Sequence, residues 1–224
     1  MAAESEQAAD FAFMMQSLSH MLSILNLKGQ HRVRRRKSAP RALSVDPANG
    51  ILPQARQVPS PNFDARPQGM AAELIVVHGI SLPPGEYGGP WIDRLFCNQL
   101  PADQHPYFRQ IAAMRVSAHL LIRRSGEIVQ YVSFNERAWH AGTSAYLGRE
   151  GCNDFSIGIE LEGVDDEAYT DAQYVNLAVV VRALCAAYPA LSAKRLVGHS
   201  DIAPGRKSDP GAAFDWPRAR ALIS

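Results

Sequence analysis

The sequence contains few cysteines and no apolar run long enough to cross a membrane. Its 3 cysteines, an odd number, are widely spaced and include no CxxC pair within the 224 residues. This count argues against a secreted disulfide framework and favours a reducing compartment. The apolar stretch at residues 11–27 is interrupted by six polar side chains, so it is too polar and too short to span a bilayer. Disulfide scaffolds and membrane-spanning proteins are therefore excluded, and we expect a cytoplasmic protein without a membrane partner.

The sequence also has almost no net charge, because 23 basic residues balance 22 acidic ones. The distribution is uneven. All 7 basic residues of the first 45 lie between Lys28 and Arg41, which leaves 16 basic against 19 acidic residues, a net charge of −3, in residues 46–224. A mildly acidic body is a poor general binder of phosphate backbones. We therefore expect no nucleic-acid partner for it.

The first 45 residues differ from the rest of the chain. Acidic residues precede the apolar stretch and the basic run follows it, which is the reverse of a secretory signal. We expect residues 1–45 to form a disordered N-terminal extension without chemistry, because chain termini are usually loosely ordered. Two alternatives stay open for the basic run, namely tethering to nucleic acid and attachment to an anionic membrane. Residues 46–224 are long enough for one domain.

From about residue 70 onward the pattern is that of a single α/β domain. Residues 120–132 contain two apolar runs separated by a turn with Gly126, which predicts a β-hairpin. The proline-rich residues 48–69 predict an extended segment without regular structure. Apolar runs and helical spacing predict the remaining elements: strands at 74–77, 156–161 and 196–198, and helices at 90–100, 170–188 and 214–223.

Two histidines each come directly after a predicted strand. His78 follows the strand at 74–77, and His199 follows the strand at 196–198. A catalytic zinc site needs ligands held with this kind of rigidity. Asp209, ten residues after His199 in a segment rich in turn residues, could return to the same edge as a third ligand. Spacing alone leaves the alternative open that each histidine is a structural residue with satisfied hydrogen bonds.

Glu160 lies within an apolar strand, where a carboxylate is costly unless it is paired or functional. The alternative is a solvated strand face, which Glu162 would share because side chains alternate with a period of two. Lys207 is either an ordinary surface cation or a charge placed to stabilise an oxyanion. Further candidates for ligands or for the lining of a sugar or peptide site are His119, His140, Tyr107, Arg115, Trp139 and Tyr146.

Four segments resemble the hallmark segments of a known family. They are VHGISLPPG at 77–85, WHAG at 139–142, NDFSIGIELEG at 153–163 and GHSDIAPGRKSDPG at 198–211. In this order they are similar to the zinc-dependent N-acetylmuramoyl-L-alanine amidases of type 2, and more closely to the AmpD-type enzymes of bacterial cell-wall recycling. The resemblance runs from about Arg56 to the C-terminus. It implies a central mixed β-sheet flanked by helices, a fold shared with phage amidases and peptidoglycan recognition proteins.

The resemblance also implies a cofactor, Zn²⁺, and a role for each matching residue. Position by position these are the zinc ligands His78, His199 and Asp209, the acid/base residue Glu160, the oxyanion-stabilising Lys207, and the substrate-contacting Tyr107 and Arg115. Independently of the resemblance, we expect Trp139 to bind substrate, with packing as its alternative role. The implied substrate is a 1,6-anhydro-N-acetylmuramoyl peptide, cut between the lactyl carbonyl and L-alanine. The implied enzyme is monomeric and cytoplasmic, and residues 46–224 form its zinc amidase domain.

The chain departs from the family pattern at two positions near the implied substrate pocket. Gly79 stands where relatives have asparagine, and Gly151 stands where they have arginine. Three alternative functions are distinguishable by experiment: a non-catalytic peptidoglycan-binding module of the same fold, a metal-free glycosidase that pairs Glu160 with Glu162, and a nucleic-acid-associated protein recruited through the basic run. Only the zinc amidase accounts for both histidines and Asp209 together.

Overall fold

Two long parallel strands form the centre of the molecule. The structure, a computed structural model, describes residues 43–224. Strand β3 (Leu74–Ile80) pairs in register with β9 (Ser156–Glu162), and both are rich in fully buried apolar side chains. Four shorter strands extend the sheet in the order β1-β5-β4-β9-β3-β10, with bounds β1 Arg56–Gln57, β4 Leu120–Ile122, β5 Ile128–Gln130 and β10 Leu196–Gly198. Only the β4–β5 hairpin is antiparallel among the pairs of this sheet, which confirms the predicted mixed sheet.

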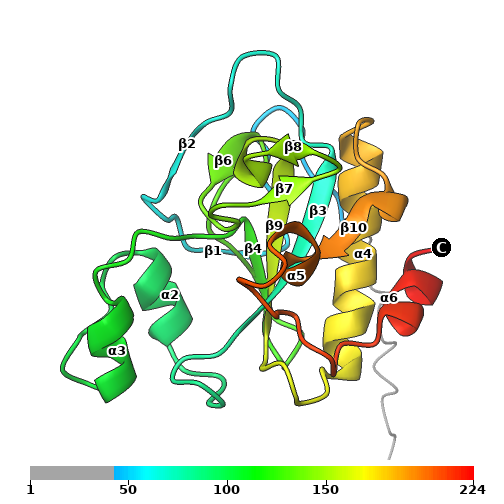
Figure 1. Cartoon of the computed structure of the whole chain (residues 1–224). Helices are drawn as coiled ribbons and strands as arrows, with labels where there is room; N and C mark the ends of the chain where they lie inside the picture. Colours follow the sequence, from blue (N-terminus) through cyan, green and yellow to red (C-terminus); the bar gives the residue numbers. More distant parts are fainter. Residues whose placement is uncertain (1–42) are drawn as a thin grey trace, which may run out of the picture. The chain divides into compact units, whose positions relative to one another are not determined.

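Helices cover both faces of this sheet (Figure 1). On one face lie α4 (Asp171–Ala187) and α6 (Trp216–Ile223), packed on odd-numbered strand residues such as Ile157 and Ile159. Helix α4 begins at Thr170, whose side chain forms a capping box with Gln173, an arrangement that satisfies otherwise free backbone donors. On the other face lie α2 (Trp91–Phe96) and α3 (Pro106–Ile111), of which α2 packs on the hairpin. The prediction that helices flank the central sheet is thus confirmed.

Short elements complete the fold. Two small antiparallel pairs lie outside the main sheet; the bounds of these and the remaining elements are β2 Phe63–Ala65, β6 Glu136–Ala138, β7 Ala145–Tyr146, β8 Arg149–Glu150, the 3-10 helices Cys152–Asp154 and Ala193–Arg195, and α5 His199–Ile202. None of the helices within residues 43–224 has the length and apolar content that crossing a bilayer requires. The predicted extension at 1–45 and its basic run fall almost entirely outside the described residues.

Several predicted boundaries were wrong. The strand predicted to end before His78 continues to Ile80, because His78 and Gly79 keep their backbone pairing with β9. The helix predicted to reach residue 100 ends at Phe96, and Asn98 adopts a left-handed conformation with φ of 60°. The segment 48–69 contains β1 and β2, and α3 was not predicted. His105 caps α3 by accepting a hydrogen bond from the Tyr107 amide.

Candidate active site

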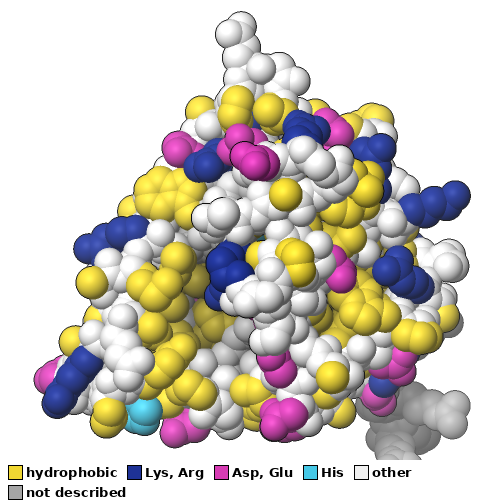
Figure 2. All heavy atoms as spheres, in the orientation of Figure 1, with side chains coloured by type: hydrophobic (Ala, Val, Ile, Leu, Met, Phe, Trp, Pro, Cys, Tyr) yellow, Lys and Arg dark blue, Asp and Glu magenta, His cyan; other side chains and the backbone are white. Residues whose placement is uncertain are grey.

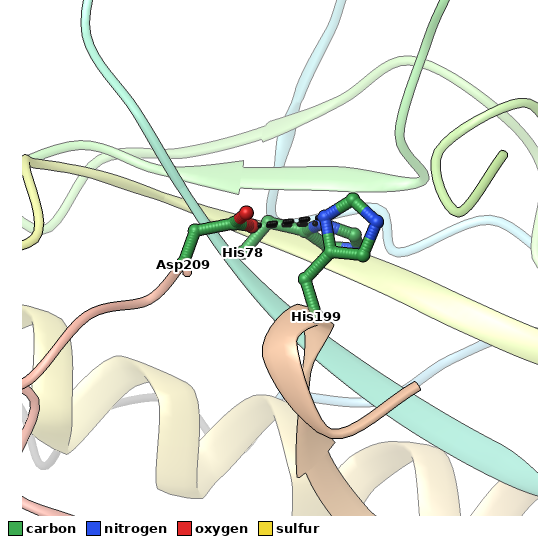
Figure 3. A group of neighbouring side chains, drawn as sticks. All are labelled: His78, His199 and Asp209. Atoms are coloured by element: carbon green, nitrogen blue, oxygen red, sulfur yellow. Dashed lines mark hydrogen bonds and ion pairs between the residues drawn. The ribbon is translucent and has the colours of Figure 1, made fainter. Parts of the chain in front are cut away.

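The three predicted ligands come from adjacent parts of the central sheet. His78 lies on β3, opposite Glu160 on β9, while β10, the other neighbour of β3, leads directly into His199 at the start of α5. Asp209 lies on the loop after α5, and the Ser200 amide donates a hydrogen bond to its carbonyl oxygen at 3.0 Å. Because parallel strands deliver their carboxyl ends to one edge of a sheet, the side chains meet there (Figure 3).

The donor atoms of these three residues converge on one point. His78 Nδ1 lies 3.0 Å from His199 Nδ1 and 3.3 Å from Asp209 Oδ2, and His199 Nδ1 lies 3.0 Å from Asp209 Oδ2. Both histidines are buried, with exposures of 2% and 3%. Within residues 43–224 this is the one group of three potential ligands close enough to share a metal ion. Two imidazole nitrogens and one carboxylate oxygen are the donor set of catalytic zinc sites.

The protonation states of the site suit a cation. Burial lowers the pKa of His78 to about 4, so its imidazole is neutral near pH 7 and keeps a lone pair for a ligand. Burial alone would raise the pKa of Asp209, but the adjacent imidazole rings of His199 and His78 hold that pKa well below its ordinary value. Asp209 is therefore an anion, and together with the neutral His78 it presents one negative charge and one lone pair to the point that His199 Nδ1 also faces.

Glu160 faces the same site from β9. Even-numbered residues of this strand point away from α4, and the loops and helices on that side bury Glu160 to an exposure of 8%. The alternative that Glu160 lies on a solvated strand face was therefore wrong. Burial raises the pKa of Glu160 well above its ordinary value, and the nearby Asp209 carboxylate raises it further. Its Oε2 atom is buried without a hydrogen-bond partner among the described residues, as expected for a carboxyl group reserved for chemistry.

A cleft of about 500 Å³ opens above these residues. One wall is polar and carries His78, Glu160, Lys207 and Asp209, whereas the opposite wall, built from the β3–α2 loop, α2 and α3, is largely apolar. On the face shown in Figure 2, basic and acidic side chains are interspersed without a large patch of one sign. The cleft is also lined by Ile80, Leu82, Leu95, Phe96, Tyr107, Ile111, Met114 and Trp139.

Of the three residues predicted to contact substrate, two line the cleft and one does not. Tyr107 and Trp139 line the cleft, and the indole Nε1 of Trp139 is buried with no hydrogen-bond partner in the part of the chain that the structure describes. Arg115 is exposed, is not among the lining residues, and donates hydrogen bonds to the carbonyls of Ala113 and Met114. Contact of Arg115 with substrate stays a prediction.

In contrast to Oε2 of Glu160, both carboxylate oxygens of Glu162 accept hydrogen bonds. Its Oε1 accepts hydrogen bonds from the Gly88 amide at 2.7 Å and from Arg123 at 3.2 Å, and its Oε2 accepts one from the Arg124 amide at 3.1 Å. Because both oxygens are engaged and the residue does not line the cleft, Glu162 is not available as the second carboxylate of a glycosidase. The geometry therefore argues against that alternative.

Gly79 and Gly151, the two positions where we expect a departure from the family pattern, each have local geometry that favours glycine. A Cβ atom at Gly79 would lie 2.5 Å from the Tyr169 hydroxyl, which donates a hydrogen bond to the Pro210 carbonyl beside Asp209 at 2.9 Å. Gly151 has a φ of 71°, a conformation that glycine adopts at low cost. Tyr169 was not among the residues predicted from the sequence. Gly79 is a glycine inside a strand, which can indicate that another group approaches the backbone closely.

His140 was named only as a candidate, and the structure places it next to the ligands. Its Nδ1 atom lies 2.9 Å from His78 Nε2, on the side of His78 that faces away from Asp209. His119, the other histidine named with it, is buried beside His140, with the two ring centroids 5.8 Å apart, and its Nδ1 accepts a hydrogen bond from the Gly158 amide at 3.0 Å. Tyr146 lies beside a separate small pocket with Leu147 and Arg149.

Comparison with known proteins agrees with this arrangement. The family model described as N-acetylmuramoyl-L-alanine amidase matches residues 68–212. The 1,6-anhydro-N-acetylmuramyl-L-alanine amidase AmpD of Salmonella typhimurium is 64% identical over 178 residues, covering 80% of this chain and 95% of its own. A crystal structure of an AmpD derivative superposes with a TM-score of 0.78 at 62% identity, covering 80% of this chain and 99% of that one.

A more distant structure carries a ligand. AmpDh3 of Pseudomonas aeruginosa, in complex with anhydromuramic pentapeptide, gives a TM-score of 0.50 at 29% identity, covering 67% of this chain and 59% of that one. The family match spans every strand of the main sheet except β1, together with the cleft and all three converging ligands. The chain therefore belongs to the N-acetylmuramoyl-L-alanine amidase family, in the AmpD-type branch that its sequence motifs predicted.

Proposed function

We propose that this amidase of peptidoglycan recycling is zinc-dependent and hydrolyses the amide bond between the lactyl group of 1,6-anhydro-N-acetylmuramic acid and L-alanine of the stem peptide. The observation that carries the proposal is the convergence of His78, His199 and Asp209 beside the buried, unpartnered Glu160 at the base of one cleft. The names of the relatives, and the anhydromuramic peptide in the AmpDh3 structure, support the substrate.

The three ligands would hold the metal, and the donor set fits zinc in number and kind. Bound there, zinc supplies Lewis-acid chemistry, which polarises a carbonyl and lowers the pKa of water to about 7. An amide otherwise resists hydrolysis because its carbonyl is stabilised by resonance and its nitrogen is a poor leaving group. The remaining requirements, a proton carrier and a partner for developing negative charge, fall to the chain's own residues.

Glu160 is the proton carrier in this proposal. Its unpartnered Oε2 accepts a proton from the attacking water and returns it to the nitrogen of L-alanine as that nitrogen leaves. The raised pKa of Glu160, caused first by burial, makes the protonated carboxyl easier to form and brings the group closer to the operating pH of a general acid and base.

Lys207 supplies positive charge on the polar wall of the cleft. Its ammonium group opposes the rise in the pKa of Glu160, so its field reaches the reacting region. In this position it stabilises the negative charge that develops on the scissile carbonyl oxygen, a contribution of roughly 2.7 to 4 kcal/mol for a preorganised donor. Tyr107 and Trp139 hold the sugar or the peptide against the apolar wall.

The proposed catalytic domain is residues 46–224, and the proposed cellular setting is a monomer in the cytoplasm. The AmpD of Salmonella typhimurium is matched over 95% of its length by 80% of this chain, so the match requires no contribution from most of residues 1–45. We assign no nucleic-acid or membrane partner to the domain, since residues 46–224 carry 16 basic against 19 acidic residues, and a mildly acidic body is a poor binder of anionic partners.

Mass spectrometry of the products from a defined 1,6-anhydro-muropeptide tests the proposal. We expect release of the intact stem peptide, its loss on treatment with a chelator, and its recovery on addition of zinc. Binding of the muropeptide without release of peptide would instead support a non-catalytic module. A new sugar reducing end would support a glycosidase. Full peptide release by protein shown to be free of metal would contradict the zinc-dependent mechanism.

A further inference from the structure

One short segment contacts both ligand histidines on their outward sides. Within residues 139–142, the Nδ1 atom of His140 lies 2.9 Å from His78 Nε2, and the carbonyl oxygen of Ala141 lies 3.1 Å from His199 Nε2. These are the two ring nitrogens that do not face Asp209. Their hydrogen bonds therefore decide which nitrogen of each ring keeps its lone pair for a metal.

The direction of each hydrogen bond follows from a fixed acceptor. The Ser156 hydroxyl donates its single proton to the Cys152 carbonyl, so its oxygen can only accept from His140 Nε2, 3.2 Å away. A neutral imidazole carries one proton, which places it on Nε2 and leaves His140 Nδ1 as an acceptor. His78 must then donate from Nε2, and its Nδ1 lone pair is left facing Asp209.

His199 is fixed by the same logic. A carbonyl oxygen only accepts, so His199 Nε2 carries the proton that it shares with Ala141, and its Nδ1 lone pair also faces Asp209. Arg206 holds this carbonyl in place, because its Nη2 donates to Ala141 at 2.6 Å and to Thr143 at 2.6 Å.

The segment is itself rigidly seated. The Asn153 side-chain oxygen accepts hydrogen bonds from the His140 amide at 3.0 Å and from the Ala141 amide at 2.8 Å. A Cβ atom at Gly158 would lie 2.4 Å from Cγ of His140, so the His140 ring lies directly against the backbone of β9. A ring packed in this way has one position, and it delivers Nδ1 to His78 without further ordering.

We propose that His140, anchored through Ser156 and Cys152, is a positioning residue that sets the tautomer of His78, while the Ala141 carbonyl sets that of His199, so that one segment prepares both histidines for the metal. This inference rests on the proposed zinc centre. Partners of this outer shell typically contribute 10- to 100-fold to metal affinity. The role requires an acceptor at the position of Nδ1, which a purely space-filling role would not.

A pair of similar-sized variants tests this requirement. His140→Asn places an amide oxygen near the position of Nδ1, whereas His140→Leu has nearly the same shape without an acceptor, and both lose the bond to Ser156. Zinc affinity is measured by competition with a chromophoric chelator. We expect His140→Leu to bind zinc about 10- to 100-fold more weakly than wild type, and His140→Asn to keep most of the wild-type affinity. Wild-type affinity in the leucine variant, or equal losses in both variants, would overturn the proposal.

A second measurement needs no substitution at His140. In ¹⁵N NMR spectra of the zinc-loaded wild type, His140 should carry its proton on Nε2 and accept at Nδ1; a proton on Nδ1 would contradict the assignment. If His140→Leu does not fold, Ser156→Ala replaces it, and we expect a smaller but measurable loss of zinc affinity; an unchanged affinity would count against the proposal. Failure of the wild type itself to bind zinc would overturn the proposed function as well, so the two failures are distinguishable.

Discussion

Glu160 and Glu162 are two residues apart on one strand, share a face and are both buried, yet their surroundings differ completely. Glu162 accepts hydrogen bonds from two backbone amides and the Arg123 guanidinium, whereas Oε2 of Glu160 has no hydrogen-bond partner within residues 43–224. A buried carboxylate with all its hydrogen bonds made stabilises a fold, and one left without them is available for reaction. The comparison teaches that satisfaction of hydrogen bonds, more than burial or strand position, separates the structural carboxylate from the chemical one.

The largest expected effect is on turnover, from Glu160→Gln. The amide keeps the size of the side chain but cannot carry the proton, so we expect the release of stem peptide to fall by about 10²- to 10⁴-fold while one zinc per chain is retained. Rates come from chromatography of the products and zinc from elemental analysis. Turnover near the wild-type level would refute the role of Glu160 as proton carrier. Glu160 and Glu162 would then not differ in their importance for the reaction.

The matched substitution Glu162→Gln should act on stability instead. It removes one of three carboxylates that pair with Arg123, whose side chain is 8% exposed, while Asp93 and Glu127 remain; weakening the hydrogen bonds of a buried carboxylate in this way costs about 1 to 3 kcal/mol. We expect urea unfolding to show this loss, while the folded variant retains turnover close to wild type. A stable protein with strongly reduced turnover would show that Glu162 takes part in the chemistry.

The pH dependence of stability should also reveal the burial of Glu160 in metal-free protein. Burial raises the pKa of Glu160 above its ordinary value of 4.5, so the folded state binds a proton that the unfolded state has released. This stabilisation is complete below about pH 4.5 and is lost as pH rises towards the folded pKa, with a slope of at most about 1.36 kcal/mol per pH unit.

Unfolding of wild type and Glu160→Gln in the presence of a chelator, at a series of pH values, measures this slope. The difference between the two proteins removes the contributions of the buried histidines, which both share. We expect the glutamine variant to gain stability relative to wild type as pH rises above 4.5, the ordinary pKa of a glutamate. Parallel curves would mean that Glu160 ionises freely in the folded protein.

The smallest effect is expected from Trp139→Phe. This substitution applies the same comparison to a hydrogen-bond donor, the indole Nε1–H group. The indole Nε1 is buried without a partner and lines the cleft, so its removal leaves no hydrogen bond broken in the folded protein. We expect the free energy of unfolding to change by less than about 1 kcal/mol and KM for the muropeptide to rise. An unchanged KM would remove Trp139 from the substrate-binding residues.

Much of the fold could be predicted from local sequence signals. The helix at Asp171–Ala187 and the strand at Leu196–Gly198 were predicted within one or two residues, because capping residues and apolar periodicity act over a few positions. The strands β2, β6, β7 and β8 were missed, since each has two or three residues and depends on a partner that such signals do not specify.

The site was predictable in its residues but not in its arrangement. The motifs pointed to His78, His199 and Asp209, which the structure brings together, but the period of two could not decide the surroundings of Glu160. That decision depends on loops and helices that cover the even-numbered face of β9. The role proposed for His140 was equally hidden, because it depends on contacts with Ser156 and Asn153 from another segment.

The proposed mechanism depends above all on one zinc ion shared by His78, His199 and Asp209. Zinc content by elemental analysis of wild type, of Asp209→Ala and of the exposed control Asp103→Ala, combined with anomalous diffraction at the zinc edge, tests it. We predict one zinc per chain in wild type and control, loss of zinc in Asp209→Ala, and an anomalous peak about 2.0 to 2.2 Å from the three donor atoms. Stoichiometric zinc in Asp209→Ala, or a peak away from these side chains, would contradict the claim.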